Sequence, residues 1–237
     1  MVVNGRSVAD ALNARLADGR AAHLVAAGLL QFVPQAALAP GEPYESFIHR
    51  TGCVPTRDNL HDFFNGLAWL RFPAIKARLN ELQAAEISRR TDPAQRGAVR
   101  DALTLFDENA AVWSAPAVLA DALRRRDWQS LFIAQRALWV QARPLLFGHA
   151  LLEKLTAPRK AVTAHVWLLP PQCDLLSGVQ GTLTPAALAA KPFLPLPVLG
   201  VPGWWPANEA ADFYDDPDVF RPGSGTSRRR PDHSRAA

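Results

Sequence analysis

Three histidines stand in segments whose residue patterns predict regular structure, and they are the first candidates for chemistry. His61 falls within Thr56–Phe72, His149 lies in an apolar stretch, and His165 lies in Ala161–Leu169. Imidazole gains or loses a proton near neutral pH and is the commonest metal ligand in proteins. Three histidines and a carboxylate are sufficient for a zinc- or iron-type site with an open position, or for acid and base catalysis. We therefore take the three as candidate catalytic residues and, jointly, as candidate metal ligands.

The segment Thr56–Phe72 (TRDNLHDFFNGLAWLRF) has the spacing of an amphipathic helix with an unusual polar face. Its apolar positions fall on one arc, which predicts the face that packs on a core: Leu60, Phe63, Phe64, Leu67 and Leu70. The opposite face carries short polar groups beside aromatic rings, namely Asp58, His61, Asp62, Asn65, Trp69 and Phe72. A face meant for water normally carries Lys, Glu or Gln, so this composition indicates the wall of a pocket.

A structural interpretation of the same face competes with the functional one. Thr56 or Asp58 can cap the helix, and Asp62 favours the positive end of the helix dipole. His61 and Asn65 would then be hydrogen-bonded polar groups of the core. In the functional interpretation these two residues, one turn apart, contribute to a site that other segments complete. Both interpretations are compatible with the sequence.

Carboxylates that can complete such a site occur in two other segments. Glu153 follows His149 by four residues, so both lie on one side of a predicted helix, where they bond to each other or face the pocket. Asp107 and Glu108 end the first strand of a hairpin predicted over Ala102–Trp113, as cleft-edge or as ordinary turn residues. We assign Glu153 a catalytic role with the histidines and predict binding roles for six residues: Asp58, Asp62, Asn65, Trp69, Asp107 and Glu108.

The remaining patterns predict a mainly helical α+β domain with a small β-sheet and a Pro-rich C-terminal arm. Helical spacing, caps and prolines predict helices at Ser7–Asp18, Ala21–Leu30, Tyr44–His49, Pro73–Arg90, Pro116–Arg126, from Asp127 onward, after Pro144 and at Pro185–Lys191. Strands are predicted within Ala102–Trp113 and Ala161–Leu169. The arm from Pro170 to Pro206 should lie over the body, with Trp204 and Trp205 at least partly buried.

Length and charge predict one domain followed by a short tail. The chain has 237 residues, 49% of them hydrophobic, which is enough for one sizeable core. The net charge of +4 comes from the residues after Phe220, which include five Arg and one Asp. The rest of the chain therefore has no net charge. A basic tail on a neutral body does not support a nucleic-acid partner. We predict a globular domain over residues 1–222 and a disordered basic tail over residues 223–237.

The cysteines and the apolar stretches predict a cytoplasmic protein without a membrane span. Cys53 and Cys173 have no CxxC spacing, which favours a reduced setting. The apolar stretch Ala21–Val33 resembles the core of a signal peptide, but His23 and Gln31 interrupt it and acidic residues precede it. No other segment approaches about 18 uninterrupted apolar residues.

Several separated motifs occur together in this chain. They are VPTRDNLHDFFNGLAWLRFP (Val54–Pro73), ALTLFDEN (Ala102–Asn109), FGHALLEKL (Phe147–Leu155), and LPVLGVPGWWPAN with FYDDPDVFRP within Leu196–Pro222. In this combination the sequence resembles the bacterial family known as domain of unknown function 3025, from about Gly28 to Pro222. The resemblance implies one contiguous domain that begins before any signal-peptide cleavage point. It implies no activity, ligand or catalytic residue.

Two classes of function compete. The chain lacks the P-loop, the strand-linked GxGxxG, HExxH, GxSxG and C2H2 patterns, so no named catalytic signature decides between them. The first hypothesis is an enzyme, hydrolytic in type, with a His and carboxylate pocket that can bind a divalent metal. The second is a non-catalytic module that binds a small molecule or a protein and whose histidines are structural. A nuclease, supported by the basic tail alone, is a weaker third. If the three imidazoles lie too far apart to share one atom, the three-histidine metal site fails.

Overall fold

The computed structural model describes residues 5–17, 22–26, 28–89 and 97–223, and it shows the mainly helical α+β architecture that the sequence predicts. Its α-helices are α1 (Val8–Leu16), α2 (Ala22–Ala26), α3 (Tyr44–Thr51), α4 (Leu60–Arg71), α5 (Pro73–Ser88), α6 (Ala98–Asn109), α7 (Ala117–Arg125), α8 (His149–Lys154), α9 (Leu175–Thr182) and α10 (Pro185–Ala189). Its strands are β1 (Gln31–Pro34), β2 (Cys53–Thr56), β3 (Ala110–Ser114), β4 (Leu145–Leu146), β5 (Thr163–Leu169) and β6 (Leu194–Pro197). The predicted tail, apart from Gly223, lies outside the described residues.

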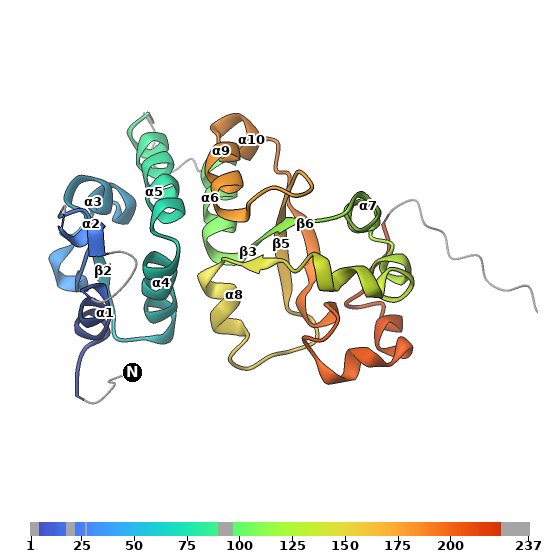
Figure 1. Ribbon diagram of the computed structural model, residues 1–237. Coiled ribbons are helices and arrows are strands. Elements are labelled where there is room, and N and C mark those ends of the chain that lie inside the picture. The colour runs from blue at the N-terminus through green and yellow to red at the C-terminus, as the bar shows by residue number, and fades with distance from the viewer. Residues whose placement is uncertain (1–4, 18–21, 27, 90–96, 224–237) are drawn as a thin grey trace, which may run out of the picture.

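The larger sheet has the strand order β4-β3-β5-β6 and is covered on both faces. β3 and β5 run parallel, with Ala111 opposite Val166, and each has one antiparallel neighbour. Successive side chains of a strand point to opposite faces, so Val112 enters one apolar core and Trp113 the other. In Figure 1, α6, α9 and α10 cover one side of this sheet, and α7 with the C-terminal segment covers the other.

A third apolar core lies in the N-terminal part of the chain, where α1, α3 and the parallel pair β1–β2 meet α4. Leu12, Phe32 and Trp69 are buried there. Ser7 caps α1 as predicted, because its side chain accepts a hydrogen bond from the backbone of Asp10. Figure 1 shows α4 and α5 standing between this part and the sheet, so both helices have neighbours on two sides.

The prediction of a hairpin over Ala102–Trp113 is wrong. Its first half is the end of α6, and only its second half is a strand, β3. Leu103 and Phe106 bury one side of α6, so the apolar run has helical spacing rather than alternation. Asp107 and Glu108 therefore lie in the last turn of a helix.

Two other segments differ from the predicted elements. After Asp127 the chain forms a π-helical turn at Ser130–Ala134 and a 3₁₀ segment at Arg136–Gln141 instead of one α-helix. Within the Pro-rich arm, where a helix was predicted only at Pro185–Lys191, Asp174 caps the additional helix α9 by accepting a hydrogen bond from the backbone of Ser177. Local capping thus overrides the high Pro and Gly content of that region.

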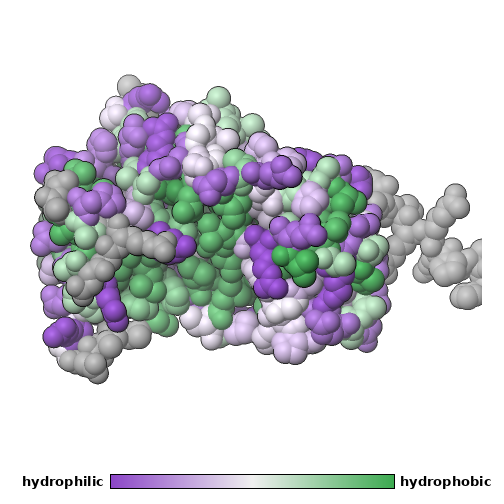
Figure 2. All heavy atoms as spheres, in the orientation of Figure 1, coloured by the Kyte–Doolittle hydropathy of each residue, from purple (hydrophilic) through white to green (hydrophobic). Residues whose placement is uncertain are grey.

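The predicted orientation of α4 is right only in part. Phe63, Leu67 and Leu70 of the apolar arc pack against the N-terminal core as predicted, whereas Leu60 is 40% exposed. Asp62 and Asn65 line a pocket, as expected, but are themselves buried. Gly66 lies so close to Leu12 of α1 that a side chain at this position would collide with it. Figure 2 shows apolar residues at the surface in the region of α4 and α8. The apolar arc of α4 is therefore only partly covered, and its polar arc faces inward.

The Pro-rich arm lies on the body as predicted. Trp204 and Trp205 are half-buried, and Trp204 packs against the core on the α7 side of the sheet. Asn208 is fully buried and donates hydrogen bonds to the carbonyls of Leu199 and Val201. These bonds satisfy backbone groups that no strand neighbour reaches.

Neither cysteine forms a disulfide, since Cys53 and Cys173 are both free. Within the described ranges, no helix combines the length and apolarity needed to cross a membrane.

Candidate functional site

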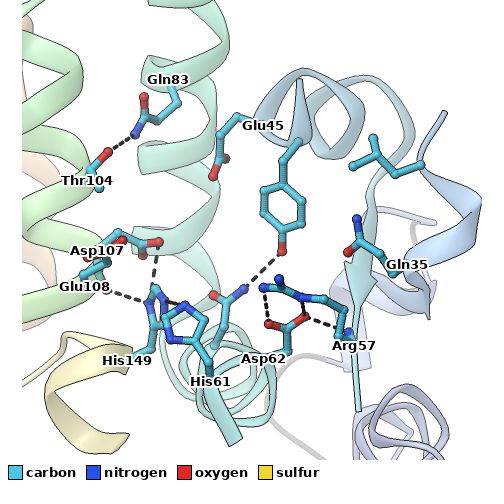
Figure 3. A pocket seen from close by; sticks show the side chains of 13 residues that line it. Gln35, Glu45, Arg57, His61, Asp62, Gln83, Thr104, Asp107, Glu108 and His149 are labelled. Atoms are coloured by element: carbon cyan, nitrogen blue, oxygen red, sulfur yellow. Dashed lines mark hydrogen bonds and ion pairs between the residues drawn. The ribbon is translucent and has the colours of Figure 1, made fainter. Parts of the chain in front are cut away.

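A polar pocket of about 350 Å³ opens where α3, α4, α5, α6 and α8 meet (Figure 3). This volume lies within the range of small-molecule sites in proteins. Thirteen of the described residues line it: Gln35, Leu38, Tyr44, Glu45, Arg57, His61, Asp62, Asn65, Gln83, Thr104, Asp107, Glu108 and His149. Leu38 is the only aliphatic residue among them, so the pocket suits a polar ligand.

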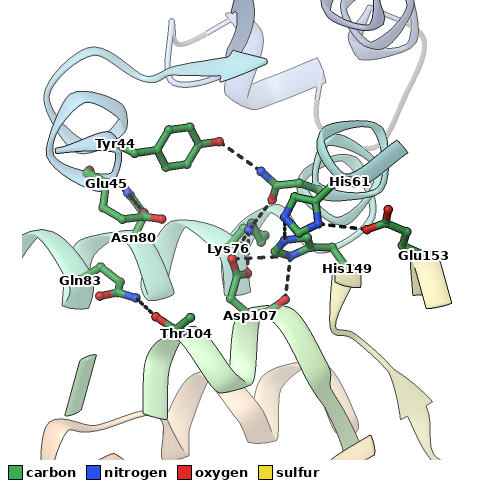
Figure 4. Close-up of polar contacts among 11 residues, drawn as sticks. Tyr44, Glu45, His61, Lys76, Asn80, Gln83, Thr104, Asp107, His149 and Glu153 are labelled. Carbon is green, nitrogen blue, oxygen red and sulfur yellow. Dashed lines mark hydrogen bonds and ion pairs between the residues drawn. The ribbon is translucent and has the colours of Figure 1, made fainter. Parts of the chain in front are cut away.

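Two imidazoles meet at one end of the pocket (Figure 4). The Nε2 atoms of His61 and His149 are 3.1 Å apart. The Nδ1 atom of His61 lies 3.0 Å from a carboxylate oxygen of Glu153, and Nδ1 of His149 lies 2.8 Å from the backbone carbonyl of Asp107. Every ring nitrogen of the pair therefore has a polar partner.

The residues that precede each histidine determine where its imidazole lies. Asn59 caps α4 by accepting a hydrogen bond from the backbone of Asp62, which puts His61 in the first turn. Gly148 precedes α8 and lies against the end of α6, where an added Cβ would be 2.5 Å from the backbone nitrogen of Asn109. Only glycine permits this approach. As a result His149, the first residue of α8, reaches the last turn of α6.

The hydrogen bonds of the two imidazoles indicate which ring nitrogens carry a proton. A backbone carbonyl only accepts, so Nδ1 of His149 carries a proton. Burial lowers the pKa of His149 to about 4, with Lys76 and His61 acting in the same direction and Asp107 opposing them. At neutral pH this ring is therefore neutral, and its Nε2 carries a lone pair that accepts from Nε2–H of His61. The carboxylate of Glu153 lies 3.0 Å from the other nitrogen of His61, so the two imidazoles and this carboxylate form one hydrogen-bonded chain.

A buried ion pair between Lys76 and Asp107 lies beside the imidazoles. The ammonium of Lys76 lies 2.6 and 2.9 Å from the two carboxylate oxygens of Asp107 and 2.8 Å from Oδ1 of Asn65. Asn65 in turn donates to the hydroxyl of Tyr44, and the ring of Trp69 lies 5.3 Å from the Lys76 ammonium. Burial alone would raise the pKa of Asp107, but Lys76 beside it holds that pKa below its usual range. Asp107 is therefore an anion within this network.

A second ion pair forms another part of the wall. Asp62 accepts hydrogen bonds from the backbone, Nε and Nη2 of Arg57 at 2.7, 3.1 and 2.8 Å. The guanidinium is 59% exposed, whereas the carboxylate is buried. The charge of Arg57 is therefore already neutralised by Asp62.

The end of the pocket away from the imidazoles is formed by α3 and α5 (Figure 4). Glu45 accepts a hydrogen bond from the side chain of Asn80, and Gln83 donates a long one, 3.4 Å, to Thr104. Burial and the Asp107 carboxylate raise the pKa of Glu45, against smaller opposing effects that include Lys76. The Oε1 atom of Gln83 is buried and has no hydrogen-bond partner among the described residues.

Most of the predicted site residues come together, although the predicted elements around Asp107 were wrong. His61 and His149 line the pocket with Asp107, and Glu153 contacts His61 rather than His149. The predicted binding residues Asp62, Asn65 and Glu108 also line it.

Three of the predicted residues lie elsewhere. Asp58 accepts a hydrogen bond from the backbone of Val8, and Trp69 lies behind the pocket, beside Lys76. His165 sits on β5 near Phe193, and no described residue forms a hydrogen bond with its buried Nδ1. Within the described ranges no three His, Cys, Asp or Glu residues are arranged to hold a metal ion. The expected three-histidine metal site is therefore corrected to a pair of imidazoles.

Several residues of the site were not predicted from the sequence. Tyr44, Glu45, Arg57 and Gln83 carry no local signal, because they reach the pocket through helix packing. Lys76, in contrast, did carry a local sequence signal. It lies beside Ile75 on a helix and one turn before Leu79 and Asn80, all of them buried, and a lysine in such a position needs a buried anion.

Comparison with known proteins identifies a family and no activity. Residues 30–224 match the model of the family described as "Protein of unknown function (DUF3025)". The chain belongs to this family, in agreement with the resemblance of its motifs. No curated protein and no solved structure matches the chain.

Proposed function

We propose that this protein is an enzyme in which His61 and His149 act together as a general acid and base on a small polar molecule. The observation that carries the proposal is the Nε2 to Nε2 contact of 3.1 Å at the end of a polar pocket. His61 is 39% exposed, whereas His149 is almost fully buried, so the pair connects the ligand space to a buried neutral base. The free cysteines Cys53 and Cys173 support a reducing, cytoplasmic setting for this enzyme.

Hydrolysis is the reaction class that we favour. Glu153, His61 and His149 form one hydrogen-bonded chain, and the neutral imidazole pair within it can act as a base. The base removes a proton from water as the water oxygen bonds to an electrophilic carbon of the substrate. The proton then passes to the leaving group as its bond to that carbon breaks. The pair ends in the protonation state in which it began.

A divalent metal held by the same two imidazoles is the second candidate. Each Nδ1 points at an acceptor, the Glu153 carboxylate or the Asp107 carbonyl, which is the arrangement that orients histidines bound to metals. Two imidazole nitrogens on one tetrahedral zinc ion are separated by roughly 3.3 Å, close to the distance found here. Such an ion would take the place of the proton between the rings. Titration of the purified protein with Zn²⁺, with and without His61→Leu, tests this candidate.

The proposal is tested by following which small molecules the protein consumes. A metabolite extract is incubated with the wild type, with His61→Leu or with His149→Gln, and mass spectrometry compares the three samples. We expect at least one compound to disappear with the wild type alone and its product to carry oxygen from labelled water. If the wild type consumes nothing, or if both variants consume the same compound equally well, the histidine pair is not catalytic. The protein would then be the non-catalytic binding module of our second hypothesis.

A further inference from the structure

Two carboxylates that line the pocket form no ion pair among the described residues, although Lys76 and Arg100 act electrostatically on one of them, Glu45. Arg57 is paired with Asp62, and Lys76 with Asp107, so each of these pairs is neutral. The two carboxylates that remain are Glu45 and Glu108. Within the described part of the chain, the only hydrogen bond to the Glu45 side chain comes from the neutral amide of Asn80, and no ion pair involves Glu108.

A second, independent feature lies beside Glu45. Gln83 is 7% exposed and lines the pocket, yet its Oε1 is buried without a hydrogen-bond partner among the described residues. A buried polar atom without a partner costs about 1–3 kcal/mol, which a bound ligand can offset. Glu45 and Gln83 also border a recess of about 10 Å³ behind the pocket, so the wall there is not fully packed.

We infer that the pocket binds a molecule that carries a protonated amine, with the ammonium group held between Glu45, Gln83 and Glu108. An ammonium group brings a positive charge for the two carboxylates and three N–H donors, one of which suits Oε1 of Gln83. Burial raises the pKa of Glu45, and a bound cation would oppose this effect. The inference rests on the proposed function and adds the class of substrate, an amine whose reactive carbon extends toward His61 and His149.

The charge preference is tested with three probes of equal chain length: butylammonium, butanol and butyrate. Their binding to the full chain is followed by amide chemical shifts in NMR spectra. We expect butylammonium to shift the amide signals of Glu45, Gln83 and Glu108 in a saturable way, and the other two probes to leave them unchanged. Equal binding of butanol, or preferential binding of butyrate, would overturn the inference.

Variants test which groups hold the ammonium. Glu45→Gln and Glu108→Gln should each weaken butylammonium binding about tenfold, and Gln83→Leu should weaken it severalfold. Asp121→Asn is the control, because this carboxylate lies on the surface of α7 and is not part of the pocket. Melting curves show whether each variant is folded. Unchanged affinity in folded Glu45→Gln and Glu108→Gln proteins would contradict the assignment.

The inference and the proposed catalysis can fail separately. His149→Gln should still bind butylammonium, because His149 lies at the other end of the pocket, although it should consume no substrate. Binding without any turnover by the wild type would refute the catalytic proposal and support the amine site. Turnover of a neutral or anionic compound that depends on His149 would support the catalytic proposal and refute the amine site.

Discussion

His61 and His149 are 88 positions apart in the sequence, yet their Nε2 atoms lie 3.1 Å from each other. The contact joins the first turns of α4 and α8, which pack side by side. Each ring is oriented from its far side, one by Glu153 and the other by the backbone of Asp107. The pair is therefore held by the packing of three helices, α4, α6 and α8.

The buried imidazole of His149 should make the stability of the protein depend on pH. Its pKa is lowered from 6.5 to about 4 by burial, so between these values the unfolded chain binds a proton that the folded protein does not. The free energy of unfolding should therefore fall as the pH is lowered from about 6.5 to about 4, by about 3 kcal/mol in total. Urea unfolding at a series of pH values measures this slope.

The control for that slope is His149→Gln, which should unfold with a much flatter dependence in the same pH range. Burial and Lys154 also lower the pKa of His165, but His165 is present in both proteins, so the difference between the two curves isolates His149. The lowered pKa of Asp107 acts in a separate window, because its contribution is lost only below the usual range of a carboxyl group. Identical slopes for the two proteins would mean that His149 is not buried as a neutral base.

Removing Lys76 should be among the most damaging single changes in this region. Lys76→Met leaves the Asp107 carboxylate without its cation in a mostly buried position, and breaking such a pair costs about 3–5 kcal/mol. Lys76→Met combined with Asp107→Asn removes both charges and should recover a large part of the loss. Denaturant unfolding of the two single variants and the double variant completes a mutant cycle. Strictly additive losses would show that the two groups do not interact.

Gly148 should tolerate no side chain. The Cβ of Gly148→Ala would lie 2.5 Å from the backbone nitrogen of Asn109, so α8 must move away from α6. We expect a loss of about 1–3 kcal/mol or more and a displaced His149. Gly181→Ala is the matched control, since its Cβ meets nothing within 4 Å on the exposed side of α9 and should raise stability by roughly 0.5–1 kcal/mol. Equal stabilities of the two variants would contradict the close approach of α8 to α6.

Replacing the two histidines should have unequal effects on stability. His61→Ala should change the free energy of unfolding by no more than about 0.5 kcal/mol, because the side chain is partly exposed. His149→Ala should cost about 1–3 kcal/mol, because it leaves the buried carbonyl of Asp107 without its donor. Thermal and urea unfolding of both variants measure the difference. A large loss in His61→Ala would indicate that His61 is mainly structural.

Local patterns predicted the elements that local interactions determine. Ser7 as a cap, Pro73 in a first helical turn and the β-branched residues of the β5 segment all led to the right elements. Asp107-Glu108-Asn109 looks like a turn between strands, and nothing nearby shows that α6 continues through it to the edge of β3. The error arose because the partners that hold this helix end, Lys76 and His149, are distant in sequence.

The candidate site was predictable in its residues but not in its geometry. Polar groups among apolar neighbours singled out His61, Asn65, His149 and Glu153, because a buried polar group needs a partner. By the same criterion His165 was also predicted, but it lies on β5 near Phe193, where its buried Nδ1 meets no hydrogen-bond partner in the described part of the chain. Which imidazoles meet depends on how α4 packs on α8, and helix packing is not encoded in any local pattern.

The tautomer of His149 tests the account of the pair most directly. Correlations between carbon-bound protons and ring ¹⁵N nuclei show which nitrogen of an imidazole carries a proton. At neutral pH we predict a neutral His149 with its proton on Nδ1, and a clear shift of its Nε2 resonance when His61→Leu removes the donor. A proton on Nε2 of His149, or an Nε2 resonance that does not respond to His61→Leu, would contradict the hydrogen bond between the two imidazoles on which the proposed catalysis depends.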